Sequence, residues 1–143
     1  TLVRFVQALT HFRRSQPTVR RRVYLTGQPH GSGQLPDVSW FDCHGHAVDW
    51  NRQELTLACL LTAPNDEEDP EGLGRDILML FNSTADPVEF KIPKVAESRV
   101  WTTFIDTGNE SPNDIYPDVD GPQLAANGKI TLTYRSMCCF VAK

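Results

Sequence analysis

The chain has 143 residues, of which 40% are hydrophobic and 22% charged, and its formal net charge is −4 at pH 7. This size and composition are typical of one globular domain with a sizeable core, and they argue against a disordered or fibrous chain. The negative charge argues against nucleic acid as a partner, because such a partner requires a broad basic surface.

The first expected element is an amphipathic helix over residues 2–14. Arg13 and Arg14 lie in its last turn, where cations complement the helix dipole, and Pro17 ends it. A single helix in front of a β domain needs a surface for its apolar side, either the sheets that follow or a neighbouring domain outside this chain. The apolar positions follow helical spacing and comprise Leu2, Phe5, Val6, Leu9 and Phe12.

The rest of the chain has the pattern of an all-β fold, an antiparallel β-sandwich of about seven or eight short strands separated by turn residues. Residues 77–81 are apolar throughout and residues 88–92 alternate, and the turn-rich stretch between them predicts a β-hairpin. We expect the other strands to pack around this hairpin. The expected strands are residues 38–41, 57–62, 77–81, 88–92, 100–105, 130–134 and 137–142, with a further extended segment at 19–25.

All four cysteines are expected to be reduced. Cys138 and Cys139 are neighbours in a strand, so their side chains point to opposite faces and do not readily form a disulfide. Cys59 lies in an apolar run, where a thiol acts as a small hydrophobic group. No signal-peptide pattern opens the chain and no apolar stretch is long enough to span a membrane, so a cytoplasmic protein is predicted.

Patterns for metal binding and catalysis are weak. Residues 43–46, Cys-His-Gly-His, lack the regular ligand pairs of zinc sites, and the aspartates at residues 114–120 lack the ligand spacing of a calcium loop. The acidic run at residues 66–71 is expected to be a solvated loop. A glycosidase instead needs two carboxylates held about 5 to 9 Å apart. No catalytic residue, metal or cofactor is therefore expected.

Trp40, Trp50 and Trp101 are the candidate substrate-binding residues, because an indole ring offers a flat surface on which a sugar ring can stack. Aromatic side chains more often belong to the core, and this alternative stays open for each of the three. Trp101 is the most convincing candidate for an outward-facing ring. The sequence Asn82-Ser83-Thr84 fits an acceptor for N-glycosylation, which has no role in a cytoplasmic protein.

Three longer stretches and three short ones form an ordered set of six. They are residues 2–27 (LVRFVQALTHFRRSQPTVRRRVYLTG), residues 37–50 with their Asp-Val-Ser-Trp-Phe start, and residues 78–93 (LMLFNSTADPVEFKIP), followed by Trp101, Asp106-Thr107 and Arg135-Ser136. In this order they resemble the C-terminal part of bacterial glycogen debranching enzymes of the isoamylase and GlgX type, in the α-amylase superfamily. The resemblance covers nearly the whole chain, except for the loops at residues 28–33 and 66–71.

The resemblance implies that residues 1–25 are the last helix and exit segment of a TIM-type barrel and that residues 26–143 are the C-terminal antiparallel β-sandwich domain. The parent enzyme would hydrolyse α-1,6 branch linkages of glycogen or limit dextrin with retention, through barrel carboxylates that have no counterpart in this chain. The domain itself would be non-catalytic and would stabilise the catalytic barrel, its partner. Binding of glycogen or malto-oligosaccharide by the tryptophans is a further hypothesis.

Two other functions stay open, namely an independent carbohydrate-binding module and a plain β-sandwich interaction domain. The helix at residues 2–14 favours the debranching-enzyme domain, because a free-standing module has no use for a barrel helix. The chain also starts at Thr1, inside the helical pattern, as expected for a piece of a longer protein.

Overall fold

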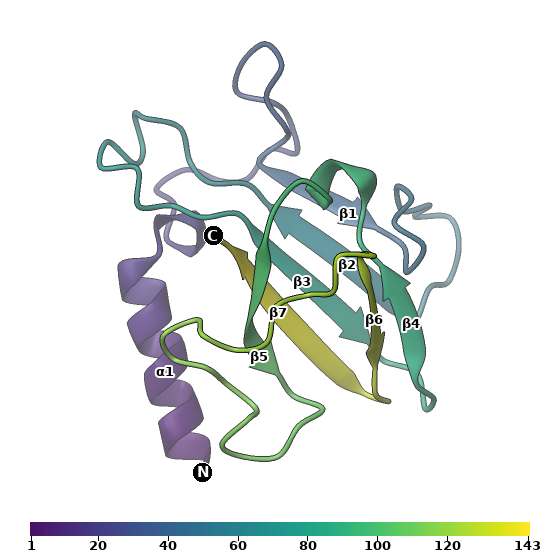
Figure 1. Ribbon diagram of the computed structural model, residues 1–143. Coiled ribbons are helices and arrows are strands. Elements are labelled where there is room, and N and C mark those ends of the chain that lie inside the picture. Colours follow the sequence, from purple (N-terminus) through teal and green to yellow (C-terminus); the bar gives the residue numbers. More distant parts are fainter.

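The computed structural model describes residues 1–143 and contains one long helix and two β-sheets (Figure 1). An all-β sandwich preceded by a helix was predicted from the sequence and is confirmed. No helix is long and apolar enough to cross a membrane. The elements are α1 (Leu2–Ser15), η1 (Pro17–Val19), β1 (Val38–Phe41), β2 (Thr56–Leu61), β3 (Ile77–Asn82), β4 (Val88–Lys91), η2 (Lys94–Ala96), β5 (Trp101–Asp106), β6 (Lys129–Leu132) and β7 (Ser136–Ala142).

The larger sheet has the antiparallel strand order β1-β2-β3-β7-β5, and the smaller sheet consists of β4 and β6. The small sheet covers one face of the large sheet, the inner face (Figure 1). Phe90 and Leu132 from the small sheet join Leu78, Leu80 and Phe140 in the buried core between the sheets. Alternate residues of the central strands therefore point either into this core or to the opposite, outer face.

The prediction of a hairpin at residues 77–92 is wrong, although both of the predicted strands exist. β3 pairs with β2 and β7, whereas β4 pairs with β6 in the other sheet, so the chain crosses from one sheet to the other as a β-arch. β3 is apolar on both faces and suits a central strand, while the alternating β4 suits a sheet with one exposed face. The same apolar pattern is compatible with a hairpin and with an arch.

Asn82 holds this arch in place. Its side chain is buried, and Nδ2 donates hydrogen bonds to the carbonyl oxygens of Asp86 and Thr133, each at 2.9 Å. Oδ1 accepts from the backbone N–H of Thr84 at 3.0 Å and from its hydroxyl at 2.7 Å. Because the amide is buried and fully bonded, the glycosylation pattern that starts at Asn82 does not present an accessible acceptor in the folded chain.

The helix α1 packs on the outer face of the large sheet. Phe12 stacks on Phe104 with ring centroids 4.1 Å apart, and Ala8 is buried in the same contact. These side chains belong to a second buried core, which also contains Ile77 and Cys139 from the central strands. The helix was expected to pack either on the sheets of its own chain or on a neighbouring domain, and in the structure it packs on the large sheet of its own chain.

The adjacent cysteines lie on opposite faces of β7, as the alternation predicted. Cys138 belongs to the inner core and Cys139 to the outer core, and all four cysteines are free. Desolvation by burial raises the pKa of Cys59 and of Cys139 to about 12. These two thiols are therefore protonated and poor nucleophiles at neutral pH.

The acidic loop between β2 and β3 is folded, which corrects the expectation of a solvated loop without fixed geometry. Asp69 is buried and accepts hydrogen bonds from the backbone N–H groups of Leu73 at 3.1 Å and Gly74 at 2.6 Å. Asn65 Oδ1 accepts from the N–H of Glu68 at 3.1 Å. Residues 19–25, predicted to be extended, form no strand of either sheet.

Candidate functional site

The helix α1 has two apolar sides. One side, with Phe5, Ala8 and Phe12, packs on the outer core of the sheet. The other side stays exposed, and Leu2 is 77% and Val6 49% accessible to solvent. We refer to the exposed set as the α1 stripe; it consists of Leu2, Val3, Val6 and Leu9.

The sequence predicted one apolar side of the helix, whereas the structure divides it into two. Phe5 and Phe12 were assigned to the same side as Leu2, Val6 and Leu9, yet only the two phenylalanines reach the sheet. Phe5, Ala8 and Phe12 follow one line of the helix at helical spacing, and the helix packs on the sheet along this line, so Leu2 and Val6 lie beside the contact. Exposed apolar side chains grouped on one surface are typical of an interaction site.

Arg4 anchors the same helix at its first turn. Its guanidinium forms an ion pair with Asp114 and donates a hydrogen bond to the hydroxyl of Ser111 at 3.1 Å. Both partners lie in the long loop after β5. The loop therefore fixes the orientation of α1 on the sheet, and with it the direction in which the α1 stripe faces.

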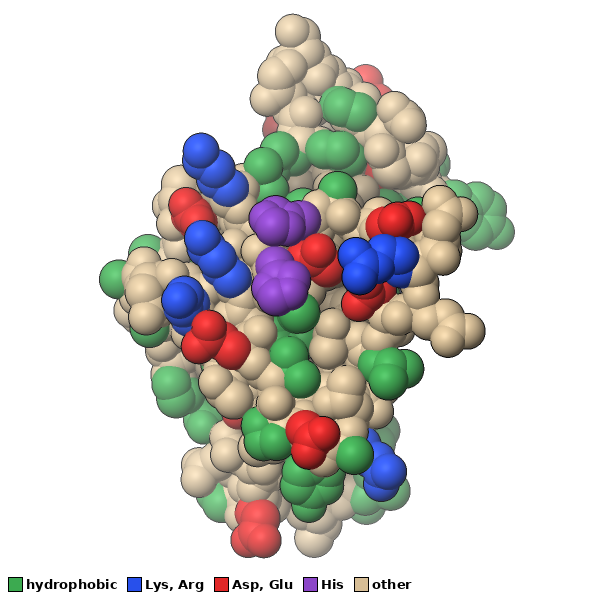
Figure 2. All heavy atoms as spheres, turned by 90° about the vertical axis from the view of Figure 1, so that its right-hand side faces the viewer, with side chains coloured by type: hydrophobic (Ala, Val, Ile, Leu, Met, Phe, Trp, Pro, Cys, Tyr) green, Lys and Arg blue, Asp and Glu red, His purple; other side chains and the backbone are tan.

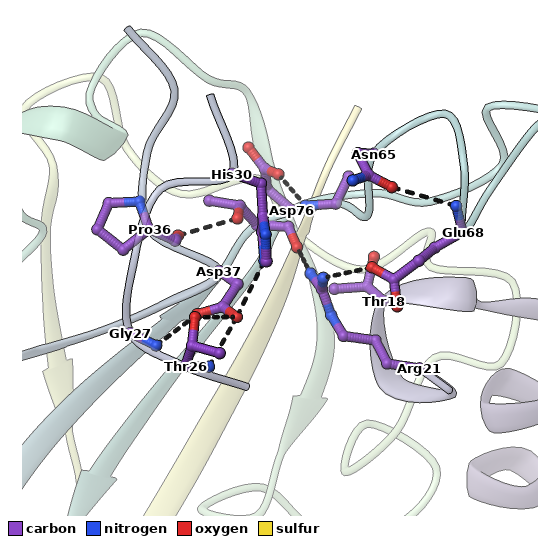
Figure 3. Close-up of polar contacts among 12 residues, drawn as sticks. Thr18, Arg21, Thr26, Gly27, His30, Pro36, Asp37, Asn65, Glu68 and Asp76 are labelled. Carbon is purple, nitrogen blue, oxygen red and sulfur yellow. Dashed lines mark hydrogen bonds and ion pairs between the residues drawn. The ribbon is translucent and has the colours of Figure 1, made fainter. Parts of the chain in front are cut away.

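A polar junction connects the exit of α1 to the start of β1 (Figure 3). The buried carboxylate of Asp37 accepts hydrogen bonds from the backbone N–H groups of Thr26 and Gly27, both at 2.8 Å, and His30 Nε2 lies 3.3 Å from it. Burial by itself raises the pKa of Asp37, but the bonds from Thr26, Gly27 and His30 outweigh burial and lower that pKa below its usual value of 3.8.

Arg21 continues the junction toward the ends of β2 and β3. Its buried guanidinium donates to the carbonyl oxygen of Thr62 and lies 3.5 Å from the carboxylate of Glu68 in the acidic loop (Figure 3). Thr18 donates its hydroxyl to the carbonyl oxygen of Arg75 at 2.6 Å, just before β3. The segment after α1 is thus tied to three neighbouring strands at one end of the sheet.

Asp37, Arg21 and Asp69 were not singled out in the sequence. Arg21 is one of three consecutive arginines at residues 20–22, and nothing in that run indicates which of them is buried. Asp37 is separated from its backbone donors by a loop of irregular structure. Many of their partners are backbone groups, and their side-chain partners, such as Glu68 for Arg21, lie far away along the chain, so no local pattern points to them. Each carboxylate accepts backbone hydrogen bonds, which is a structural arrangement rather than a catalytic one.

Trp101, the preferred candidate for an outward ring, is buried, so that expectation is wrong. It is only 2% exposed, it belongs to the inner core, and its Nε1 donates to the carbonyl oxygen of Ala96 at 2.8 Å. The alternation of β5 is broken by an irregularity in its pairing between Thr103 and Ile105. In addition, η2 and the loop around it close over the end of this edge strand.

Trp40 and Trp50 are exposed, so the alternative that they are core residues does not apply to these two. Trp40 lies on the edge strand β1 and is 38% exposed, and Trp50 lies in the following loop and is 68% exposed. Their rings form an edge-to-face pair with centroids 6.0 Å apart and an interplanar angle of 72°. We refer to this pair as the aromatic corner.

The cluster at residues 42–46 forms a turn. Asp42 Oδ1 accepts the backbone N–H groups of His44 at 2.9 Å and His46 at 3.0 Å, and the two histidine rings lie 6.3 Å apart. No group of three or more potential metal ligands is present. On the face shown in Figure 2, acidic and basic side chains surround two adjacent histidines, and hydrophobic side chains form small separate groups.

Comparison with known proteins found two kinds of relative. The chain is 30% identical over 116 residues to "Isoamylase 3, chloroplastic" from Oryza sativa subsp. japonica, a match to 80% of this chain and 12% of that protein. It is also 30% identical over 129 residues to the "Glycogen operon protein GlgX homolog" of Mycobacterium bovis and Mycobacterium tuberculosis, with 83% of this chain and 17% of those proteins matched. No family model matches the chain.

The comparisons confirm the resemblance to isoamylase and GlgX proteins that the sequence indicated. The chain spans less than a fifth of the length of these relatives, as the matched shares of 12% and 17% show. The homology is therefore that of a short segment to a part of a much longer protein.

Proposed function

We propose that this chain, a homologue of isoamylase 3 and of the GlgX homologues, is the C-terminal domain of a glycogen debranching enzyme. The parent hydrolyses α-1,6 branch linkages of glycogen or limit dextrin in a catalytic barrel that precedes the domain. The domain is non-catalytic and stabilises the barrel by holding α1 against it. The free cysteines support a reducing compartment, such as the cytoplasm.

The observation that carries this proposal is the double-sided helix. One side of α1 is fixed by Phe12 on Phe104 and by the ion pair of Arg4 with Asp114, while the α1 stripe faces solvent. A short helix held rigidly with an open apolar side is suited to dock on a second domain. Burial of the α1 stripe would contribute on the order of 5 kcal/mol, at about 1.5 to 3 kcal/mol for each fully buried side chain.

The polar junction supports the same role. Asp37 and Arg21 connect the segment after α1 to the ends of β1 and β2 by buried hydrogen bonds, which supports a fixed position of the helix on the large sheet. Contact with the α1 stripe would therefore transmit the rigidity of the sandwich to the barrel. The buried carboxylates Asp37 and Asp69 are occupied by backbone N–H groups, which supports a structural rather than a catalytic use of these acids.

A pair of substitutions in α1 tests this proposal. In the parent enzyme we expect Val6→Asp to lower the melting temperature by at least about 4 °C relative to Gln7→Asp, because a buried charge in a domain contact is costly. In the 143-residue chain the two variants should melt together, since Val6 is half exposed there and both changes place aspartate in the same helix. Differential scanning calorimetry of all four proteins gives the comparison.

The control Gln7→Asp lies on the polar side of α1 and introduces the same residue with the same helix propensity. Equal melting temperatures of the two parent variants would mean that the α1 stripe is not a domain contact, and the buttress role would be abandoned. A large loss caused by Val6→Asp in the 143-residue chain alone would equally contradict the proposal, because the stripe would then belong to the core of this domain.

A further inference from the structure

We propose that the aromatic corner, Trp40 and Trp50, is a surface site that binds a linear segment of α-glucan by stacking glucose rings on its indoles. The inference rests on the proposed function, because it takes the ligand to be the same polymer that the parent enzyme debranches. It adds a site for holding substrate chains on a domain without catalytic groups, well away from the α1 stripe.

The geometry of the pair suits a sugar chain. Trp50 is 68% and Trp40 38% exposed, so both rings keep accessible apolar surface. At an interplanar angle of 72° the two rings form the walls of a corner instead of one flat plate. A glucose ring packs its C–H face on one wall while the next ring of the chain meets the other. An α-1,4-linked chain curves from ring to ring and fits such a corner better than a straight chain.

The corner is preorganised by its backbone. The N–H of Val48 donates to the carbonyl oxygen of Trp40 at 3.2 Å, so the loop returns alongside the edge strand. Asp49 then closes a turn around Trp50, with its carboxylate accepting the N–H of Asn51 at 3.0 Å and its carbonyl oxygen accepting the N–H of Arg52 at 3.1 Å. A ring that is already held in position loses little conformational entropy on binding.

A glycine lets this loop pack against the small sheet. Gly45 has a φ of +80°, and a Cβ atom at this position would lie 2.9 Å from the carbonyl oxygen of Ile92. The N–H of Lys91 donates to the carbonyl oxygen of Cys43 at 2.9 Å in the same contact. The loop that carries Trp50 is therefore attached to both sheets, and an indole that is largely exposed stands on a well-supported backbone.

The charges around the corner favour a neutral polyol over nucleic acid. Bases also stack on aromatic rings, but proteins that bind single strands place such rings in a positively charged groove. Here one arginine, Arg52, stands next to the two carboxylates of Asp49 and Glu54, and Arg52 Nε lies 3.7 Å from Glu54 Oε1. These side chains offer donors and acceptors to sugar hydroxyls without an excess of positive charge.

The corner is distant from the helix. Trp40 lies on β1 at one edge of the large sheet, and α1 contacts Phe104 on β5 at the other edge. Four strand spacings separate these edges, about 19 Å at ~4.8 Å per strand. A glucan at the corner would therefore not compete with a barrel docked on the α1 stripe, and the two sites can be tested independently.

The experiment is titration of the 143-residue chain and of the parent enzyme with maltoheptaose and with soluble glycogen, followed by calorimetry and tryptophan fluorescence. We expect saturable binding of both sugars to both proteins. Trp50→Ala should weaken the binding of maltoheptaose to the 143-residue chain at least tenfold, and Trp40→Ala should have a similar effect. The exposed aromatic Tyr134, remote in sequence, provides the control variant Tyr134→Ala, which should bind as the unmodified chain does.

Three results would overturn the site. The first is that the 143-residue chain shows no saturable binding, and the second is that Trp50→Ala leaves the binding unchanged. The third is that the 143-residue chain binds the sugars but the parent enzyme does not, because the rest of the enzyme would then cover the aromatic corner. None of these depends on Val6. If Trp50→Ala abolishes binding while Val6→Asp leaves the parent's melting temperature unchanged, the glucan site stands and the buttress role fails.

Discussion

At the scale of single residues, Asp37 shows how a buried acid can stabilise a fold without taking part in chemistry. Its carboxylate receives two backbone N–H groups and the side chains of Thr26 and His30, and its pKa is lowered in the folded chain. Since the folded form binds its proton more weakly than the unfolded form, Asp37 stabilises the fold at pH values well above 3.8. This contribution is lost as the pH falls through the lower, folded-state pKa.

The prediction at this scale concerns Asp37→Asn. We expect the variant to lose about 2 kcal/mol of the free energy of unfolding at pH 7, because charge-assisted hydrogen bonds become neutral ones. The loss should shrink as the pH is lowered below 3.8, where the unmodified chain also loses the charge. Urea unfolding between pH 3 and pH 7 measures both effects.

The exposed acid Asp66 provides a matched control for this change. Asp66→Asn removes the same charge from the surface, and its unfolding midpoint should follow that of the unmodified chain at each pH. A constant difference between Asp37→Asn and the unmodified chain across the whole pH range would show that packing, rather than the ionised hydrogen bonds, accounts for the loss.

At the scale of elements, the arch between β3 and β4 depends on one amide. Asn82 bonds both sides of the arch and reaches the end of β6 through the carbonyl oxygen of Thr133. We expect Asn82→Ala to cost about 3 kcal/mol, because it removes the hydrogen bonds of a buried amide and leaves a cavity in its place. Thermal unfolding should show the loss. Asn127→Ala, which removes an exposed turn amide that accepts only from Lys129, should cost well under half as much.

If Asn82→Ala and Asn127→Ala had the same melting temperature, the arch would be held by its apolar strands alone.

The strands of this fold could be predicted from the sequence, but not all of their partners. The positions of all seven strands followed from their apolar patterns, since those patterns are local. The partners of β3 and β4 did not, because turn-rich sequence between two strands leads equally to a hairpin or to an arch. In the structure the pairing of β4 with β6 defines the arch, and the buried side chain of Asn82 is bonded within it.

The candidate sites were predictable to a different degree. Trp40 and Trp50 were identified as possible platforms from their residue type, but their exposure depends on β1 being an edge strand, which is a property of the whole sheet. Trp101 also lies on an edge strand, yet the loop around η2 closes over it. The polar junction had no signal in the sequence, because Asp37 and Arg21 bond to backbone groups remote along the chain.

At the scale of the whole molecule, the two proposed surfaces lie at opposite edges of one sheet. The helix that carries the α1 stripe stacks on β5, and the aromatic corner includes Trp40 of β1. A domain arranged in this way can contact the enzyme with one edge while the other edge holds a glucan chain. The central strands β2, β3 and β7 connect the edges, and they are apolar on both faces.

The same strand order makes a prediction about truncation. Removal of residues 136–143 deletes β7, which pairs with β3 on one side and β5 on the other. We expect the shortened chain to lose cooperative unfolding and far-UV circular dichroism of the β type, because the sheet then separates into two parts. Removal of residues 1–16, which deletes α1 but no strand, should instead retain a β-sheet spectrum with a lowered melting temperature. A native-like spectrum of the shorter C-terminal deletion would contradict this expectation.

The late position of β7 in the chain has a consequence for biosynthesis. As a ribosome releases the chain, β3 and β5 emerge with unpaired edges, and nothing can fill the gap between them until β7 follows. A chain that ends before residue 136 therefore has two unpaired strand edges, which are prone to pair with other chains. The strand that completes the large sheet is therefore the last of its five strands to be made, and the sheet can form only after all five have left the ribosome.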